Sequence, residues 1–173
     1  ADVGWKALAV NLSDIAAMGG APLYAVVTLG LPPDTPVEDV EALYDGMLEC
    51  GAAHGGTIVG GDVVRSPVAF ITVAMMGTTP GPLLTRSAAR PGQQVAVTGA
   101  LGASGAWLAA LRQKTHLDPG VAATLRRAHL RPEPRIEAGQ RLRLAGVRCA
   151  IDISDGLVAD LRQVCRASGA AAR

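Results

Sequence analysis

Aromatic residues are scarce in this sequence: one Phe, two Trp and two Tyr make up 3% of its 173 residues. So few rings argue against a surface on which nucleic-acid bases stack. Charge of one sign is also missing, because 16 Lys and Arg against 15 Asp and Glu leave a net charge of +1. Without a basic stripe, neither a nucleic acid nor an anionic membrane surface is an expected partner.

Cysteines and long apolar runs are few as well. Cys50, Cys149 and Cys165 are odd in number, lie far apart and match no zinc-binding spacing. In a chain without a signal peptide, they predict reduced thiols and a cytoplasmic protein. No apolar run approaches the roughly 18 residues of a membrane-spanning helix, so no membrane partner is expected.

The apolar residues, 49% of the chain by a wide definition, follow helical and strand-like patterns in alternation. The first part of the chain predicts helices over 5–18 and 37–55, and strands over 23–31, 57–61 and 68–76. A capping box at Thr35–Glu38 opens the second helix. The second part predicts strands over 93–99 and 147–154, and helices that end near residues 111, 130, 146 and 169.

Alternation of this kind predicts a mixed α/β (α+β) fold in which helices cover a sheet. Pro80, Gly81 and Pro82 interrupt the patterns and predict a domain boundary. We therefore expect an N-terminal domain over residues 1–81 and a C-terminal domain over residues 82–173. The chain begins without Met and stops soon after a helical pattern, so we expect it to be an internal fragment of a longer protein.

Four aspartates occupy positions where a carboxylate is unusual: Asp14, Asp62, Asp152 and Asp155. Taken singly, most have an ordinary explanation. Asp14 is compatible with a solvated helix face, Asp62 with an Asx-turn, and Asp155 with a helix N-cap, a role that Ser154 fits equally well. Asp152 alternates with isoleucines, and a half-buried acid there needs a partner.

Together the four acids point to a metal site. Three of them follow predicted strands or precede a helix, where α/β proteins gather their ligand sites. Clustered acids repel one another unless a cation screens them, and no set of His or Cys accompanies them. Oxygen-only ligands select Mg²⁺ or Mn²⁺, and Mg²⁺ on a few carboxylates commonly carries the phosphates of a nucleotide.

A glycine-rich segment, "VTGALGASG" over 97–105, is the candidate on the phosphate side. It precedes a helix, so its backbone N–H groups are suited to hold an anion, although glycines also serve close helix–sheet packing. The segment is neither a Walker A loop nor a G-x-G-x-x-G motif, and Asp118 is a weak match for a ribose-binding acid. Arg65 and Arg86 are candidates to neutralise phosphate.

The order of the motifs resembles one family. "VNLSDIAAMGGAPL", "IVGGDVVRS", "LTRSAARPGQQVAVTGALGASG", "HLRPEPRIEAG" and "IDISDGLVADL" are similar to motifs of the thiamine-monophosphate kinases. That family belongs to the superfamily of aminoimidazole ribonucleotide synthetase and selenophosphate synthetase. The resemblance covers essentially the whole chain.

The resemblance implies a synthetase-like fold of two α/β domains, with the N-terminal sheet forming half of a β-barrel that closes across a homodimer. It also implies ATP-dependent phosphorylation of thiamine monophosphate to thiamine diphosphate, with Mg²⁺ as the cofactor. The transfer is expected to be direct and in line, so no nucleophilic side chain is expected from the protein.

By motif, the resemblance also assigns site residues. The implied magnesium ligands are Asp14, Asp62, Asp152 and Asp155. The implied ATP contacts are Tyr44, Gly61, Asp62, Arg86 and Ser154. Arg65 and Ser66 belong to the same signature as Asp62, but the resemblance gives them no role.

The chain departs from the family by omission. An earlier Asp-rich segment with a substrate-contacting His, and a later acidic "GED"-type motif with an aromatic residue for the thiamine end, do not occur in it. Family members are roughly twice this long, the size of a two-domain protein. We therefore expect the fragment alone to be inactive.

Three alternatives remain open. The chain is also compatible with another ATP-using enzyme of the superfamily, such as a selenophosphate synthetase or a hydrogenase-maturation protein. A non-catalytic nucleotide-binding dimerisation module is disfavoured, because a scaffold has no need of buried like charges. A dinucleotide-binding Rossmann unit is the weakest of the three.

Overall fold

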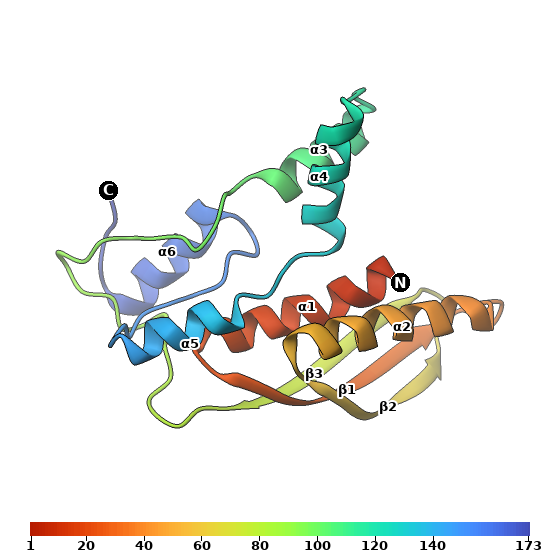
Figure 1. Ribbon diagram of the computed structural model, residues 1–173, viewed down its shortest axis with the longest axis horizontal. Coiled ribbons are helices and arrows are strands. Elements are labelled where there is room, and N and C mark those ends of the chain that lie inside the picture. The colour runs from red at the N-terminus through yellow and green to blue at the C-terminus, as the bar shows by residue number, and fades with distance from the viewer.

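The computed structural model describes residues 1–173 as six helices and one three-stranded sheet (Figure 1). In chain order, the elements are α1 (Asp2–Ala17), β1 (Ala21–Leu31), α2 (Val37–His54), β2 (Thr57–Arg65), β3 (Phe70–Thr78), α3 (Ala103–Gln113), α4 (Pro119–Leu130), α5 (Ile136–Leu144) and α6 (Leu157–Ser168). The predicted mixed α+β fold is confirmed. None of the helices combines the length and the apolar character needed to cross a membrane.

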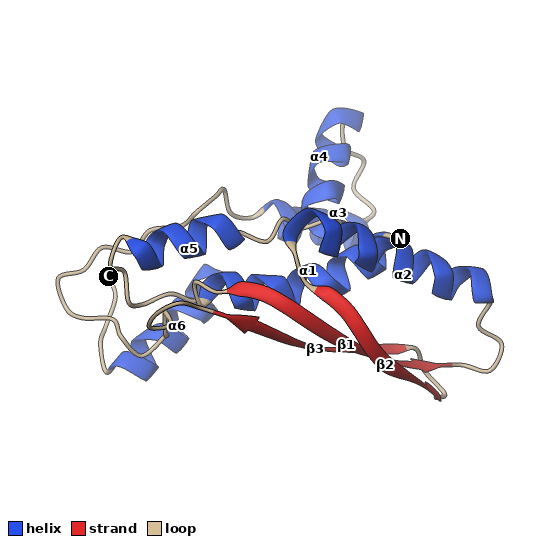
Figure 2. Ribbon diagram, turned by 60° about the horizontal axis from the view of Figure 1, so that its bottom comes forward, coloured by secondary structure: helices blue, strands red, loops and turns tan.

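β1 is the central strand of the sheet, parallel to β2 on one side and antiparallel to β3 on the other. Helices α1 and α2 lie together on one face of this sheet (Figure 2). Every second residue of β1 points into the core between the sheet and these helices. The buried core cluster consists of Leu8, Ala9, Leu12, Ala25, Val27, Leu29, Met47 and Cys50.

The cysteines are all free in this structure. Burial, and to a smaller extent the charge of Glu49, raises the pKa of Cys50 to about 11. The thiol of Cys50 is therefore neutral at physiological pH and acts as a small apolar core residue.

Side-chain hydrogen bonds tie the second half of the chain to the first mainly at two places. At one, α5 lies on the end of α1: Gln140 Nε2 donates to the carbonyl oxygen of Gly20 at 3.1 Å, and Arg143 Nε donates to that of Gly19 at 3.0 Å. A Cβ atom at Gly139 would lie 1.9 Å from the carbonyl oxygen of Ala16, so only glycine fits this helix contact.

The other tie is a cluster around Arg131, which follows α4. Its guanidinium donates to both carboxylate oxygens of Glu49 at 2.7 Å and to Asp2 at 2.8 Å. These two acids raise the pKa of Arg131, whose guanidinium also lies 4.9 Å from the ring centroid of Trp5. The indole of Trp5 donates to the carbonyl oxygen of Pro132 at 2.9 Å, which completes the link from α4 to α1 and α2.

Two predicted strands are wrong. Residues 93–99 and 147–154 form no β-ladder. Val95 and Val97 are 61% and 40% exposed, although their pattern predicts a buried strand. An apolar alternating segment becomes a strand only where another strand pairs with its backbone, and these residues have no such partner within residues 1–173.

Two boundaries also differ from expectation. The capping box does not form, because Pro36 is the N-cap of α2 and no side chain caps the helix. β2 continues past the predicted end at Gly61 to Arg65, because the β-branched Val63 and Val64 extend its pairing with β1. The domain boundary near residue 82 stays a prediction: no helix or strand lies between Thr78 and Ala103, while α5 packs on α1.

Helices α1 and α2 cross in backbone contact at two glycines. A Cβ atom at Gly4 would lie 1.8 Å from the carbonyl oxygen of Leu43, and one at Gly46 would lie 1.8 Å from that of Ala1. We expect Gly46→Ala to lower the free energy of unfolding by about 2 kcal/mol, because the helices must move apart. Thermal and urea unfolding of the complete protein would measure this.

Gly105→Ala in α3 is the matched control, since nothing lies within 4 Å of a Cβ atom built there. Alanine has the higher helix propensity, so this variant should be as stable as the wild type or slightly more stable. If Gly46→Ala were as stable as Gly105→Ala, the close contact of α1 and α2 would not require glycine at this position.

Candidate functional site

Backbone hydrogen bonds bring three separate segments together beside the end of α1. The N–H of Leu84 donates to the carbonyl oxygen of Met18 at 3.1 Å. The next N–H, that of Thr85, donates to the carbonyl oxygen of Arg148 at 3.0 Å. The turn after α1, the segment around Arg86 and the segment that leads to Asp152 therefore form one region of the molecule.

Two of the predicted metal ligands, Asp14 and Asp152, lie in the same neighbourhood of this region. Asp14 keeps contact with solvent, but partial burial raises its pKa, and the negative charge of Asp152 raises the pKa further. Residues 138 positions apart in the sequence thus place two carboxylates in one neighbourhood. A divalent cation with oxygen ligands fits such a pair, because it would remove their mutual repulsion.

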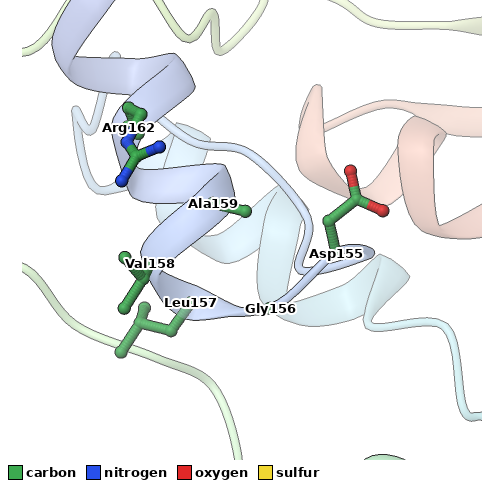
Figure 3. Close-up of a pocket in the computed structure, with 6 residues that line it drawn as sticks. All are labelled: Asp155, Gly156, Leu157, Val158, Ala159 and Arg162. Carbon is green, nitrogen blue, oxygen red and sulfur yellow. The ribbon is translucent and has the colours of Figure 1, made fainter.

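The loop from Asp152 to Gly156 is organised by hydrogen bonds of its own. Ser154 Oγ donates to Asp152 Oδ2 at 3.0 Å. The backbone N–H groups of Ser154, Asp155 and Gly156 donate to Asp160 Oδ2 at 2.9, 3.0 and 3.2 Å. In Figure 3 the carboxylate of Asp155 points away from α6, on the side where the salmon ribbon of the start of the chain passes.

The sequence pattern did not single out Asp160, and neither of the two N-cap candidates that it offered is the cap. Neither Asp155 nor Ser154 caps α6; the N-cap is Gly156, with φ of 108°. Asp160, in the first turn of α6, takes up the free N–H groups instead. The available signal was an acid four residues after the glycine of "SDGLVAD", close enough to reach back to the loop.

A pocket of about 400 Å³ lies at the start of α6 (Figure 3). Asp155 and Arg162 are its charged residues, and the rest of the lining is Gly156, Leu157, Val158 and Ala159. Arg162 lies in the second turn of α6, and its guanidinium and the Asp155 carboxylate point to different sides of the helix in Figure 3.

Asp62 lies elsewhere. It pairs in register with Thr28 of β1, which points away from the α1–α2 face, so Asp62 lies on the open face of the sheet. It is inside β2 rather than at a strand end, and its Oδ1 accepts from the N–H of Val63 at 2.9 Å. β2 and α6 lie towards opposite ends of the molecule in Figures 1 and 2.

The four aspartates therefore do not form one ligand set within this chain. No group of three or more His, Cys, Asp or Glu side chains lies close enough together to hold a metal ion. Asp14 and Asp152 fit part of an oxygen-ligand site, and the assignment of all four as magnesium ligands stays a prediction.

The predicted ATP contacts fall in different places. Gly61 has a structural reason to be glycine, since a Cβ atom there would lie 1.8 Å from the carbonyl oxygen of Val27. Tyr44 is half-buried against the core on α2. Arg86 has an exposed side chain, and its carbonyl oxygen accepts from Ser168 Oγ of α6 at 2.9 Å. Of these residues, Arg86 and Ser154 lie in the region beside Asp14.

Ser66 now has a structural role. It is buried, its N–H donates to the carbonyl oxygen of Leu31 at 2.9 Å, and its Oγ accepts from the N–H of Val68 at 3.3 Å. These bonds shape the connection from β2 to β3. Arg65 is exposed at the end of β2.

The glycine-rich segment leads into α3 through Gly102, with φ of 97°. Ser104 Oγ lies 2.9 Å from Nδ1 of His129, and Nζ of Lys6 lies 3.4 Å from Nε2 of the same ring. Asp118 is the N-cap of α4, accepting from the N–H groups of Gly120 and Val121 at 2.9 and 3.3 Å. A cap explains Asp118 without a ribose.

Comparison with known proteins adds an independent line of evidence. The family model "AIR synthase related protein, N-terminal domain" matches residues 1–79. The thiamine-monophosphate kinase of Escherichia coli K12 is 43% identical over the whole chain, which covers 53% of that enzyme. The corresponding enzyme of Bacillus subtilis is 37% identical over 96% of the chain. The chain spans about half the length of these curated relatives.

Solved structures agree in fold. "AaThiL complexed with AMPPCP and TMP" has a TM-score of 0.90 and 37% identity, and the match covers 97% of this chain and 54% of that one. The hydrogenase maturation protein HypE of E. coli has a TM-score of 0.80 and 26% identity, covering 96% of this chain and 52% of that one. Residues 1–79 therefore match the AIR synthase-related N-terminal domain, and the whole chain is similar to about half of the thiamine-monophosphate kinases.

Proposed function

We propose that this chain is the nucleotide-binding part of an enzyme that phosphorylates thiamine monophosphate to thiamine diphosphate with ATP. The observation that carries the proposal is the region where Asp14 and Asp152 interact, next to Arg86 and Ser154. A relative of the same fold is described with AMPPCP, in which a methylene bridge replaces the oxygen between the β- and γ-phosphates of ATP, and with TMP.

In this proposal the protein positions the reactants and supplies no covalent nucleophile. A phosphate oxygen of thiamine monophosphate attacks the γ-phosphorus of ATP directly while the bond to the β,γ-bridging oxygen breaks and ADP leaves; the charge of the attacking oxygen makes a strong general base unnecessary. Asp14, Asp152 and Asp155 would hold magnesium. Asp62 would be the fourth ligand once its carboxylate is brought close to the other three. Magnesium, when bound, neutralises charge that develops on the phosphate oxygens. Arg86 would add positive charge on the phosphates.

Ser154 and Tyr44 are proposed to contact ATP, as is Gly61 of β2. Ser154 is well suited to this role, because its hydroxyl already bonds Asp152 at 3.0 Å and so has a fixed direction. Tyr44 contributes from α2, where its ring packs against the core.

We also propose that the protein is a cytoplasmic homodimer that closes over the open face of the sheet. This face carries exposed apolar residues on all three strands: Tyr24, Val26, Val64, Phe70 and Met76. Exposed apolar side chains gathered on one face of a sheet favour a protein partner over solvent. The three free cysteines suit a reducing compartment.

The first prediction concerns the reaction. The complete protein should convert thiamine monophosphate and Mg-ATP to thiamine diphosphate and ADP, detected by chromatography. A single 173-residue chain lacks a full ligand set and should form no product. Product from the 173-residue chain would show that this chain alone holds every ligand that the reaction needs, contrary to the proposal. No product from the complete protein would move the assignment to a sister protein such as HypE.

The second prediction concerns Asp14. Asp14→Asn in the complete protein should lower kcat about a hundredfold, because loss of one carboxylate weakens charge neutralisation in the transition state. We expect the same direction for Asp62→Asn. Asp45→Asn is the matched control, an exposed mid-helix aspartate on α2 that should keep kcat within about twofold of wild type. Wild-type kcat for Asp14→Asn at saturating Mg²⁺ would remove Asp14 from the site.

The third prediction concerns assembly. Val26, 44% exposed at the middle of the open face, should be buried in the dimer, so Val26→Glu should give a monomer in sedimentation velocity. A charge buried in an apolar interface without a partner is strongly unfavourable. Val37→Glu, at the exposed start of α2, should remain dimeric. A dimeric Val26→Glu variant would show that another surface forms the contact.

A further inference from the structure

Asp160 is the only buried acidic residue of the chain, with 6% of its surface exposed. No Lys, Arg or His forms an ion pair with it. Its Oδ2 instead accepts three consecutive backbone N–H groups at 2.9, 3.0 and 3.2 Å. Burial of a lone carboxylate is costly, and three charge-assisted hydrogen bonds offset that cost.

The three donors belong to the loop that carries the candidate ligands. Ser154, Asp155 and Gly156 lie outside every helix and strand, so no backbone ladder holds them. The effect extends further along the chain, because the hydroxyl of Ser154 donates to Asp152. A continuous set of hydrogen bonds therefore runs from Asp160, through the backbone of the loop, to the carboxylate of Asp152.

We propose that Asp160 is a positioning residue for the metal and nucleotide site. Its carboxylate fixes the loop in which Asp152 accepts from Ser154 and Asp155 points away from α6, as Figure 3 shows for Asp155. Asp160 does not itself contact the ligand, because it is buried and its Oδ2 already has three donors. The identity of the ligand rests on the proposed function, whereas the position of the loop does not.

The competing explanation is a helix cap that only stabilises α6. Asp118 plays that part for α4, where it accepts two backbone N–H groups at 2.9 and 3.3 Å with no candidate ligand in the capped turn. The two aspartates make the same kind of bond at the start of helices of equal length. Asp118→Ala is therefore a matched control for Asp160→Ala.

The experiment compares wild type, Asp160→Ala, Asp160→Asn and Asp118→Ala in the complete protein. Binding of Mn²⁺ in the presence of AMPPCP is measured by electron paramagnetic resonance, and amide hydrogen exchange over residues 154–156 is measured without metal or nucleotide. We expect Asp160→Ala to weaken Mn²⁺ binding about tenfold and to speed exchange by a similar factor. Asp118→Ala should lower Tm yet leave Mn²⁺ affinity within about twofold.

Asp160→Asn keeps an oxygen acceptor but loses the charge, so its Mn²⁺ affinity should lie between wild type and Asp160→Ala. If Asp160→Ala does not fold, the Mn²⁺ affinity of Asp160→Asn serves as the test of the positioning role. Unchanged Mn²⁺ affinity in the folded Asp160 variants, or equal losses in Asp118→Ala, would overturn the proposal. Weakened Mn²⁺ binding in a protein whose wild type makes no thiamine diphosphate would refute the kinase assignment and leave the positioning role standing.

Discussion

Helix α1 is in backbone contact with another helix near each of its ends, and the rest of the structure depends on this double contact. At one end, Gly4 and Gly46 let α2 approach until there is no space for a side chain. At the other end, Gly139 of α5 lies against the carbonyl oxygen of Ala16. A helix fixed in this way cannot slide or rotate without a steric clash, so the position of Asp14 relative to the sheet is set by packing.

The remaining parts of the site are attached to α1 through main-chain atoms. Leu84 and Thr85 connect the turn after α1 to the segment before Asp152. Such bonds matter here because Asp14 and Asp152 carry charges of the same sign; partial burial, and then this repulsion, raise the pKa of Asp14. Flexible side chains would separate to relieve that repulsion. Backbone ties hold the main-chain segments that carry the two carboxylates, and under the proposal Asp160 adds to this order before any cation arrives.

Prediction from the sequence succeeded where the signal was local. The spacing of Leu8 and Leu12 identified α1, and the run around Val27 and Leu29 identified β1. Both patterns were reliable because these side chains are all buried in the one core between the helices and the sheet. The strand predictions for residues 93–99 and 147–154 were wrong. An apolar pattern predicts that a segment is buried, whereas a strand also requires a second strand to pair with its backbone.

The site was predictable in part for the same reason. Asp14 and Asp152 stood out because an acid among apolar residues is unusual, and the structure places them together. Asp160 was overlooked, since one acid in the first turn of a helix is commonplace and only the fold shows that it is buried. Asp62 lies within β2 rather than at its end because Val63 and Val64 extend the strand. That extension results from pairing with β1, which the sequence of β2 alone does not reveal.

The open sheet face and the divided ligand set have a common physical consequence. Asp62 shares this face with Val26 and Phe70, so any partner that covers the apolar residues also takes water away from the Asp62 carboxylate. A carboxylate buried without a counter-charge opposes association, whereas a carboxylate bound to a cation does not. Under the proposed dimer, metal binding at Asp62 and closure of the sheet face therefore favour each other, and by linkage each strengthens the other by the same factor.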